Sequence, residues 1–350
     1  MKKILIILSL LLGLIWLVAM PALVGSYLDR VVPEWLDEAG MAGTAQFDAG
    51  WFTSSLQIED DYAVDLHGRH VPPLSLAWIR IDGELEAPIS PAPIEIDGQF
   101  GLTGLSSVRL EAAELAIEGP VQLESSASRL TLNQGLDQAS ELSWQIEALG
   151  LNDRLGNALE ASTAELALSW SPSDQAVGDE ATAPKQADAF DLRLALELLS
   201  DADRDPTLRL FIEASPVQRD ALAELIAGLQ QWSQAQAQST ARQFALLTIA
   251  GAWQQLSQNG LTIRLDRLQI GSDSRFSGYW VTQEGPPDLR GEGSIEALTR
   301  ELRPIVGLSA QVSAGTAERS IRTWIDEIRQ RGWLVLEGDR FEFRYPAPQP

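Results

Sequence analysis

Two histidines are the side chains best suited to chemistry in this chain. His67 and His70 stand in the run H-G-R-H, and a pair at this spacing can share a metal ion on a helix. Gly68 and the prolines at 72 and 73 argue against a helix, and no cysteine is present to complete a zinc site. We therefore expect a solvated or hydrogen-bonded loop here, and we predict neither a metal site nor a cofactor.

Nucleophilic hydroxyls and phosphate-binding loops lack their usual sequence context. A Ser–His–Asp triad would need one of the same two histidines, and the chain contains no Gly-x-Ser-x-Gly elbow. It also contains neither Gly-x-x-x-x-Gly-Lys-Ser/Thr nor Gly-x-Gly-x-x-Gly. The sequence therefore predicts a protein that is not an enzyme of a recognisable class, with no assigned catalytic residue.

Carboxylates are the one reactive group present in excess. The chain has 49 acidic and 26 basic residues, for a net charge of −23. Pairs such as Asp60-Asp61 or Asp203 and Asp205 are common by chance in so acidic a chain. An anchored periplasmic hydrolase that uses two carboxylates is kept as the alternative function. It requires two or three Asp or Glu side chains converging in a cleft, and carboxylates spread over a wet face would contradict it.

The acidic balance also bears on partners. Nucleic acid is excluded as an expected partner, because neutralising phosphates requires clustered Lys and Arg. Broad adsorption on anionic lipid is disfavoured for the same reason. The absence of cysteine rules out disulfides and thiolate metal sites. The acidic surface is expected to keep the body of the protein soluble, with recruitment of a basic partner as a lesser possibility.

The N-terminus predicts a membrane anchor. Lys2 and Lys3 precede Ile4–Val24, a run of 21 residues without a charge. At about 1.5 Å per residue, such a helix spans a hydrocarbon core of roughly 30 Å. Lysines before the run and acidic residues after it indicate a cytoplasmic N-terminus and an exported remainder. We predict an uncleaved single-pass anchor over residues 1–25, with the remainder of the chain exported. A cleaved signal peptide is the alternative.

The remainder of the chain predicts a β-dominated α+β fold. Residues 26–40 carry apolar side chains at helical spacing and predict a juxtamembrane helix. From there, residues 41–350 predict an exported β-rich domain. Apolar and polar residues alternate in many short runs, as at 142–146 and 166–170. This pattern is typical of a large, mainly antiparallel twisted sheet with one apolar face. We expect helices to cover that face in part.

A long loop and a helical insert interrupt the strands. Residues 171–189 lack periodicity and predict an exposed loop. The insert at 216–258 predicts one long helix or two joined near 234–238, with Ser215 as the N-cap and Pro216 in the first turn. Two apolar stripes on the insert are expected in the core: Leu222, Leu225, Ile226, Leu229 and Trp232, and Phe244, Leu247, Trp253 and Leu256.

The C-terminal part predicts two helices and a closing hairpin. A helix is expected at about 295–306 and another at 316–331. A hairpin follows over 332–345, with its turn at 337–339. The buried stripe of the second helix is expected to consist of Ile321, Trp324, Ile325 and Ile328.

Two segments carry a resemblance to a known family. The run FDAGWFTSS (47–55) after an N-terminal anchor, and RGWLVLEGDRFEFRY at the C-terminus, resemble the YdgA-like family of bacterial membrane-anchored envelope proteins. The resemblance implies a bacterial inner membrane, with the bulk of the protein in the periplasm, and brings no settled activity. The order of elements is similar, more distantly, to AsmA-like proteins, which are associated with phospholipid movement between membranes. The positions that carry the family pattern, and that are candidate contact residues, are Gly50, Trp51, Phe52, Ser54, Ser55, Gly338 and Asp339.

The aromatic run itself predicts packing rather than catalysis. Leu56 and Ile58 after it begin strand alternation, so we expect a strand start whose rings pack against the body, with Gly50 relaxing the backbone. Contact of the rings with lipid or a partner is the alternative. Together these observations predict a non-enzymatic β-rich scaffold or lipid-handling protein. Its expected partners are the inner membrane, through residues 4–24, and a lipid or another envelope protein.

Overall fold

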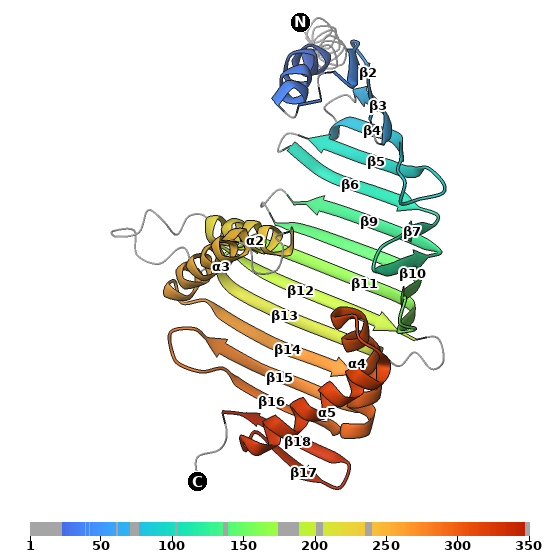
Figure 1. Cartoon of the computed structure of the whole chain (residues 1–350). Coiled ribbons are helices and arrows are strands. Elements are labelled where there is room, and N and C mark those ends of the chain that lie inside the picture. Colours follow the sequence, from blue (N-terminus) through green and yellow to red (C-terminus); the bar gives the residue numbers. More distant parts are fainter. Residues whose placement is uncertain are drawn as a thin grey trace, which may run out of the picture. The chain divides into compact units, whose positions relative to one another are not determined.

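The computed structural model describes ten stretches of the chain, which form two compact units (Figure 1). The predicted anchor, apart from its last three residues, and the centre of the predicted loop at 171–189 lie outside the described residues. Within the described residues, no helix combines the length and the apolar composition that a bilayer crossing requires. The described stretches are 23–38, 40–41, 43–60, 62–70, 77–101, 104–135, 139–173, 189–200, 206–234 and 240–346.

The first unit is built on an antiparallel sheet. Each strand from β1 to β6 pairs with the next, and β6 pairs with β9. A short hairpin of β7 and β8 lies between β6 and β9 in the chain. The strands are β1 (Ala45–Ala49), β2 (Thr53–Glu59), β3 (Ala63–His70), β4 (Ala77–Glu86), β5 (Ile94–Gly101), β6 (Gly104–Ala112), β7 (Leu115–Ile117), β8 (Val121–Ser125) and β9 (Ala127–Gln134).

Alternation gives this sheet two unlike faces, because successive side chains of a strand point to opposite sides. On one face Ile96 pairs with Leu110, and on the other Asp97 pairs with Arg109. A small core of Ile94, Ala112 and Leu115 lies at one end of the apolar face. The predicted juxtamembrane helix is observed at residues 23–38.

The second unit contains the longest strands. β10 (Ser140–Asp153) contributes residues to both units. From β11 to β16 each strand pairs antiparallel with the next, and β16 pairs with β18, which also pairs with β17. The β-dominated fold with a large antiparallel sheet is therefore confirmed. The strands are β11 (Ala158–Pro172), β12 (Ala189–Leu199), β13 (Pro206–Gln218), β14 (Thr262–Ile270), β15 (Ser274–Val281), β16 (Asp288–Ser294), β17 (Leu334–Glu337) and β18 (Arg340–Tyr345).

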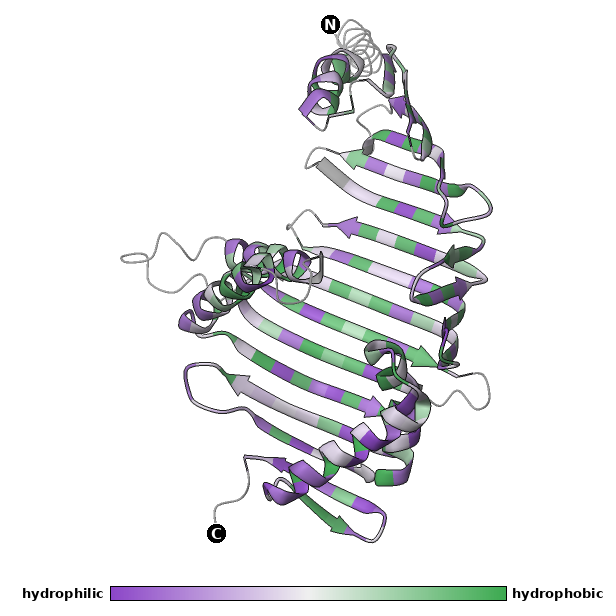
Figure 2. Ribbon diagram, viewed as in Figure 1, coloured by the Kyte–Doolittle hydropathy of each residue, from purple (hydrophilic) through white to green (hydrophobic). Residues whose placement is uncertain are grey.

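Two pairs of helices lie on the same face of this second sheet (Figures 1 and 2). The first pair is α2 (Arg219–Gln234) and α3 (Thr240–Gln258), and the second is α4 (Ile295–Ala310) and α5 (Ala314–Gln330). The α2–α3 pair packs on Leu192 and Ala214, and the α4–α5 pair packs on Leu208. Leu192 pairs with Ala214 and Leu198 with Leu208, an even spacing along both strands that puts both contacts on one face.

The predicted start of the helical insert is wrong. β13 continues through Ser215 and Pro216 to Gln218, and α2 begins only at Arg219. The Ser215 hydroxyl does not cap the helix, because it donates its hydrogen bond to the Asp191 carboxylate on the neighbouring strand β12. The insert consists of two helices, which is one of the two arrangements expected from the sequence.

The prediction that both helical stripes are core is also wrong in part. Leu222, Leu225, Trp253 and Leu256 do pack on the sheet. The rest of the two stripes is exposed, because α2 and α3 rest on the sheet only where they leave and rejoin it. On α5, Trp324 is exposed, since the three isoleucines of its stripe already fill the contact with the sheet. The exposed stripe residues of α2 and α3 are Ile226, Leu229, Trp232, Phe244 and Leu247.

Candidate functional site

Leucine and isoleucine side chains meet in register on the helix-bearing face of the second sheet. Leu196 on β12 pairs with Leu166 on β11 and with Leu210 on β13. One step along the strands, Leu194 makes the same pairings with Leu168 and Ile212. We call this surface the trough floor, and its residues are Leu166, Leu168, Leu194, Leu196, Leu210, Ile212 and Leu265.

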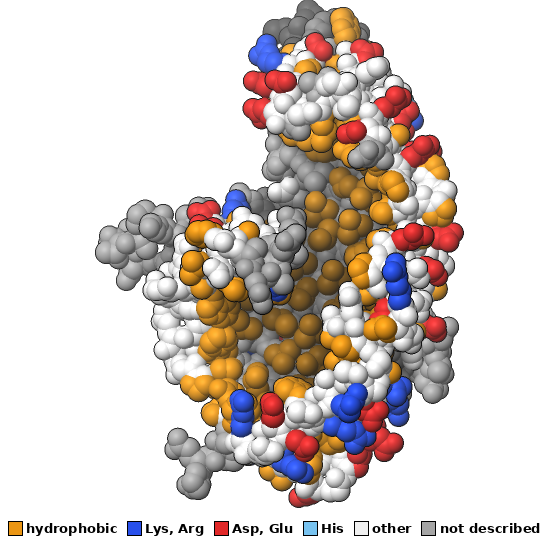
Figure 3. All heavy atoms as spheres, viewed as in Figure 1, with side chains coloured by type: hydrophobic (Ala, Val, Ile, Leu, Met, Phe, Trp, Pro, Cys, Tyr) orange, Lys and Arg blue, Asp and Glu red, His pale blue; other side chains and the backbone are white. Residues whose placement is uncertain are grey.

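The trough floor is apolar but incompletely covered. Each of its seven side chains is partly exposed. Some residues that lie under the helices are fully buried, with Val217 3% and Ile270 6% exposed, whereas Leu192, Leu208 and Ala214 are partly buried like the floor. Figure 3 shows hydrophobic side chains gathered in a hollow between the two helix pairs. Contiguous exposed apolar surfaces can form ligand-binding grooves or contact sites for proteins and membranes.

Helix α4 forms one wall of the trough and is fastened at both ends. At its start, Asp339 and Ser294 bind the free N–H groups of the first turn. Just beyond its end, the Asn157 side chain donates to the Val312 carbonyl at 2.8 Å. The 16 residues of α4 extend about 24 Å, which matches five inter-strand spacings of about 4.8 Å. The helix therefore reaches across the strands from β16 to the β10–β11 turn.

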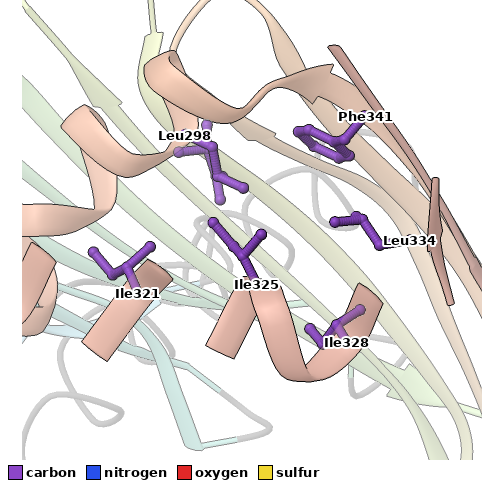
Figure 4. Close-up of a cluster of buried hydrophobic side chains, with 7 residues drawn as sticks. Leu298, Ile321, Ile325, Ile328, Leu334 and Phe341 are labelled. Carbon is purple, nitrogen blue, oxygen red and sulfur yellow. The ribbon is translucent and has the colours of Figure 1, made fainter. Parts of the chain in front are cut away.

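A packed core supports this wall (Figure 4). Ile321, Ile325 and Ile328 of α5 form one cluster with Leu298 of α4 and with Leu334 and Phe341 of the closing hairpin. The Phe341 ring stacks on Phe276 with centroids 5.7 Å apart. The α4–α5 wall is thus held by a continuous apolar contact.

The α2–α3 pair forms the opposite wall and is attached at one end. Trp253 of α3 packs against Trp280 of β15, with ring centroids 5.4 Å apart. The Thr282 hydroxyl donates to the Ser257 carbonyl at 3.0 Å, and Gln283 donates to the Gln258 carbonyl at 2.7 Å. All of these contacts lie at the end of α3 that rejoins the sheet.

The other face of the second sheet is charged. Glu213 on β13 lies 3.0 Å from Arg193 and 2.9 Å from Arg264, each on a neighbouring strand. Arg209 and Glu197 form a similar pair at 3.4 Å. Exposed pairs of this kind contribute little to stability and keep a face wet. An apolar ligand of the second unit would therefore bind in the trough and not on the charged face.

Carboxylates gather on the wet face of the first unit around a hollow of about 560 Å³. Glu84 pairs with Asp65 and Glu95, and Asp82 pairs with Asp97, so like charges face each other directly across the strands. The lining residues with ionisable side chains are Asp65, His67, Asp82, Glu84, Glu95, Asp97, Arg109 and Glu111.

This hollow brings carboxylates together, as the hydrolase alternative requires, but it leaves most of them exposed to water and not in an apolar pocket. Glycoside hydrolysis needs one carboxyl kept protonated by an apolar environment beside one that stays ionised. Here Asp65 and Asp82 are 51% and 56% exposed, so water surrounds both. Among the described residues, no group of three or more His, Cys, Asp or Glu side chains is placed to hold a metal ion.

The histidine pair lies on a strand, so the prediction of a loop over these residues is wrong. His67 and His70 both belong to β3, where positions three apart face opposite sides of the sheet. His67 lies 3.5 Å from Asp65 on the wet face. His70 is buried, and its Nδ1 lies 3.0 Å from the Trp51 carbonyl oxygen. The two rings therefore do not converge.

The prediction that the rings of the aromatic run pack is wrong for Trp51 and Phe52, whereas Phe47 is half-buried on β1 opposite Leu56. Trp51 is 68% and Phe52 49% exposed in the loop between β1 and β2. Only the backbone is held there: the His70 N–H donates to the Phe52 carbonyl at 2.8 Å, and the Gly50 N–H donates to the Thr53 carbonyl at 2.7 Å. The loop turns before strand pairing begins, which leaves both rings outside the sheet.

The two serines of the pattern have an ordinary place in β2. Ser54 pairs with Ala49 and Gly68, and Ser55 pairs with His67. A Cβ on Gly68 would lie 2.4 Å from the Ser54 hydroxyl oxygen, so this glycine allows the close approach of the two strands.

The C-terminal positions of the pattern are structural. Gly338 has φ +65° at the turn between β17 and β18, a conformation that favours glycine. Asp339 caps α4, and reasoning from the sequence did not find this role because its partner Ser294 is remote in the chain. The structure therefore assigns the pattern positions to loops, strands and a helix cap.

Comparison of the chain with protein-family models, with curated proteins and with solved structures finds no match. The resemblance to the YdgA-like family therefore stays a prediction, and the trough rests on its geometry alone.

Proposed function

We propose that the trough of the second unit binds the acyl chains of a lipid. The observation that carries this proposal is the trough floor, seven aliphatic side chains left partly exposed between two helix pairs. Burying a methylene group is worth about 0.8 kcal/mol, so ten buried methylenes would contribute about 8 kcal/mol before the costs of immobilising the ligand.

The composition of the trough floor favours lipid over a protein partner. Protein interfaces are enriched in Trp, Tyr, Met and Arg at their centres. The seven floor residues are only Leu and Ile, with no polar group to orient a peptide, although Trp170 adjoins them on the same face of β11. A surface that is aliphatic, recessed and without hydrogen-bonding groups suits a chain of methylenes better than a polypeptide. The scaffold function remains the second candidate, and it predicts that another envelope protein covers the same surface.

We further propose that the protein works at a bacterial inner membrane, with its bulk in the periplasm. This rests on the uncharged run Ile4–Val24, on the lysines before it and on the resemblance to anchored envelope proteins. A carboxylate-dependent hydrolase is not proposed, because the gathered carboxylates stand in water on the wet face of the first unit.

Photo-crosslinking in the full chain tests the acyl-chain proposal. A photo-reactive side chain at Leu196 faces the trough, and one at Ala195 faces the charged side of the same strand. Isolation of the protein from bacterial membranes after irradiation, followed by mass spectrometry, should give lipid adducts at position 196 and few at 195. Protein adducts at 196 would favour the scaffold, and no adduct there would remove the lipid function.

A further inference from the structure

The free end of the α2–α3 hairpin carries large apolar side chains in water. We call this surface the hairpin tip. It extends from the middle of α2 to the end of that helix and from the start of α3 to its middle, away from the contacts of both helices with the sheet. Residues 235–239, between the two helices, lie outside the described residues and are not part of it. Its side chains are between 37% and 68% exposed, and they are Ile226, Leu229, Trp232, Phe244, Leu246 and Leu247.

The apolar side chains of the hairpin tip are exposed for a different reason on each helix. On α2 the stripe that begins with Leu222 and Leu225 on the sheet continues as tip residues beyond the contact. On α3 the apolar surface goes round the helix: Leu246 and Leu247 lie about 100° and 200° from the buried Ala245, at 100° per residue. A helix that is apolar all round is normally buried in protein or lipid.

Charge is nearly absent from this hairpin. The full chain has 75 charged residues in 350 (26 basic and 49 acidic). The hairpin, residues 219–258, contains four: Arg219, Asp220, Glu224 and Arg242, of which only Arg242 lies between residues 226 and 247. The Arg242 guanidinium lies 4.4 Å from the centre of the Trp232 ring. The acidic charge that would repel a headgroup layer is therefore missing here, and one cation accompanies a tryptophan as at membrane interfaces.

We propose that the hairpin tip inserts into the headgroup–acyl boundary of a phospholipid bilayer. A helical surface with apolar residues on several sides matches a fluid, deformable partner, which can surround it. In that position Trp232 would lie at the level of the headgroups, with the Arg242 guanidinium over its ring. The same two helices form a wall of the trough, so an inserted tip would place the trough next to the bilayer. A role in passing acyl chains between the two rests on the proposed acyl-chain function.

Site-specific labelling tests the insertion. The chain has no cysteine, so a single introduced thiol can carry an environment-sensitive nitrobenzoxadiazole dye. Leu247→Cys places the dye on the tip, and Gln254→Cys places it at an exposed position of the same helix near the sheet. The full chain is reconstituted in phosphatidylcholine vesicles with and without lipids that carry a shallow spin-label quencher.

The expected result is at least threefold stronger quenching at position 247 than at 254. Equal quenching at both positions, or none at 247, would overturn the proposal. A blue-shifted but unquenched dye at 247 whose emission depends on protein density would show that a second copy covers the tip, and it would overturn bilayer insertion as well. A polypeptide partner would shield the dye only after that partner is added, again without quenching by lipid.

The two proposals can fail separately. The double variant Phe244→Gln, Leu247→Gln is expected to lose the quenching, read from a dye at Leu246→Cys, while lipid crosslinking at position 196 in detergent extracts stays unchanged. Leu196→Gln is expected to reduce lipid occupancy and to leave the quenching at position 247 unchanged. If the Leu196→Gln variant also loses the quenching at position 247, bilayer insertion requires the trough, and the proposal that the hairpin tip inserts by its own side chains is wrong.

Discussion

The carboxylate of Asp339 holds the hydroxyl of Ser294 at the first turn of α4. One carboxylate oxygen accepts the hydrogen bond from the Ser294 hydroxyl, and the other accepts one from the Glu296 N–H at 3.1 Å. The Ser294 oxygen in turn accepts from the Ala297 N–H at 3.1 Å, and the Asp339 carbonyl accepts from the Ile295 N–H at 2.9 Å. The turn of the last hairpin therefore satisfies the free N–H groups of α4 and puts a negative charge at the positive end of its dipole.

Replacing Asp339 should weaken the wall of the trough. Asp339→Ala is expected to lower the free energy of unfolding by about 1–2 kcal/mol, because it removes a helix cap and a favourable charge together. Asp339→Asn keeps an acceptor and should lose less. Urea unfolding followed by circular dichroism measures both changes. Glu337→Ala is the control, since this residue is exposed on the same hairpin; a loss equal to that of Asp339→Ala would refute the capping role.

The β10–β11 turn should respond to acid through Asp153. Hydrogen bonds from the Asn157 side chain, and from backbone N–H groups at Asn157, Leu155 and Gly156, lower the pKa of Asp153 below its ordinary 3.8. Because the pKa is lower in the folded state, the contribution to stability is present above the unfolded pKa of about 3.9 and is lost as pH falls through the folded value.

Stability measured at decreasing pH below about 4 tests this turn. Asp153→Asn cannot titrate, so its free energy of unfolding should fall less steeply with acid than that of the wild type. Asn157→Ala removes the largest cause of the lowered pKa and should move the acid transition of this group upward. Identical pH profiles for the wild type and Asp153→Asn would show that the turn does not contribute.

Two glycines on neighbouring helices provide a matched test of how closely α4 is seated. A Cβ on Gly307 would lie 2.4 Å from the Asn157 side-chain oxygen, whereas one on Gly315 of α5 would meet nothing within 4 Å. Gly307→Ala should destabilise by about 1–3 kcal/mol through overpacking. Gly315→Ala should be neutral or stabilise by up to about 1 kcal/mol through helix propensity. Thermal unfolding separates them, and a neutral Gly307→Ala would mean that the Asn157 contact can yield.

The exposed aromatic loop should matter little for stability. Trp51→Ala is expected to change the free energy of unfolding by less than about 0.5 kcal/mol, since its ring stands in water. Phe341→Ala, at 4% exposure in the core under α5, should cost about 3–5 kcal/mol. Unfolding of both variants under the same conditions checks the contrast. A loss of several kcal/mol in Trp51→Ala would mean that the ring is covered in solution.

Features that depend on local pattern could be predicted from the sequence. Alternation over 166–170 puts Leu166 and Leu168 on one face because a strand repeats every two residues, whatever surrounds it. The closing hairpin is similarly local: β17 and β18 fall within the predicted 332–345, and Gly338 takes the positive φ that its turn needs. A β-dominated, largely antiparallel fold follows from the repetition of such patterns.

Features that depend on distant partners could not be predicted. Ser215 is a good N-cap by type, but its hydroxyl finds Asp191, 24 residues away, on the next strand. Leu222 and Leu229 belong to one stripe of α2, yet only the first meets the sheet. The position at which a helix departs from the sheet determines which part of its apolar stripe is covered. The local sequence pattern does not indicate that position. The uncovered trough floor is hidden from the sequence for the same reason.

Ligand-linked stability gives the last prediction, on the trough itself. A ligand that binds only the folded protein stabilises it by about 2.7 kcal/mol when its free concentration is 100 times its Kd. A single-chain phospholipid added below its micellar concentration should therefore raise the thermal unfolding midpoint of the wild type. Leu196→Asp puts a carboxylate on the trough floor and should abolish the rise, because acyl methylenes cannot desolvate a charge without a large penalty. Ala195→Asp adds the same charge on the opposite face and should keep the rise. If both variants keep it, the lipid binds elsewhere, and the trough is then a surface for protein.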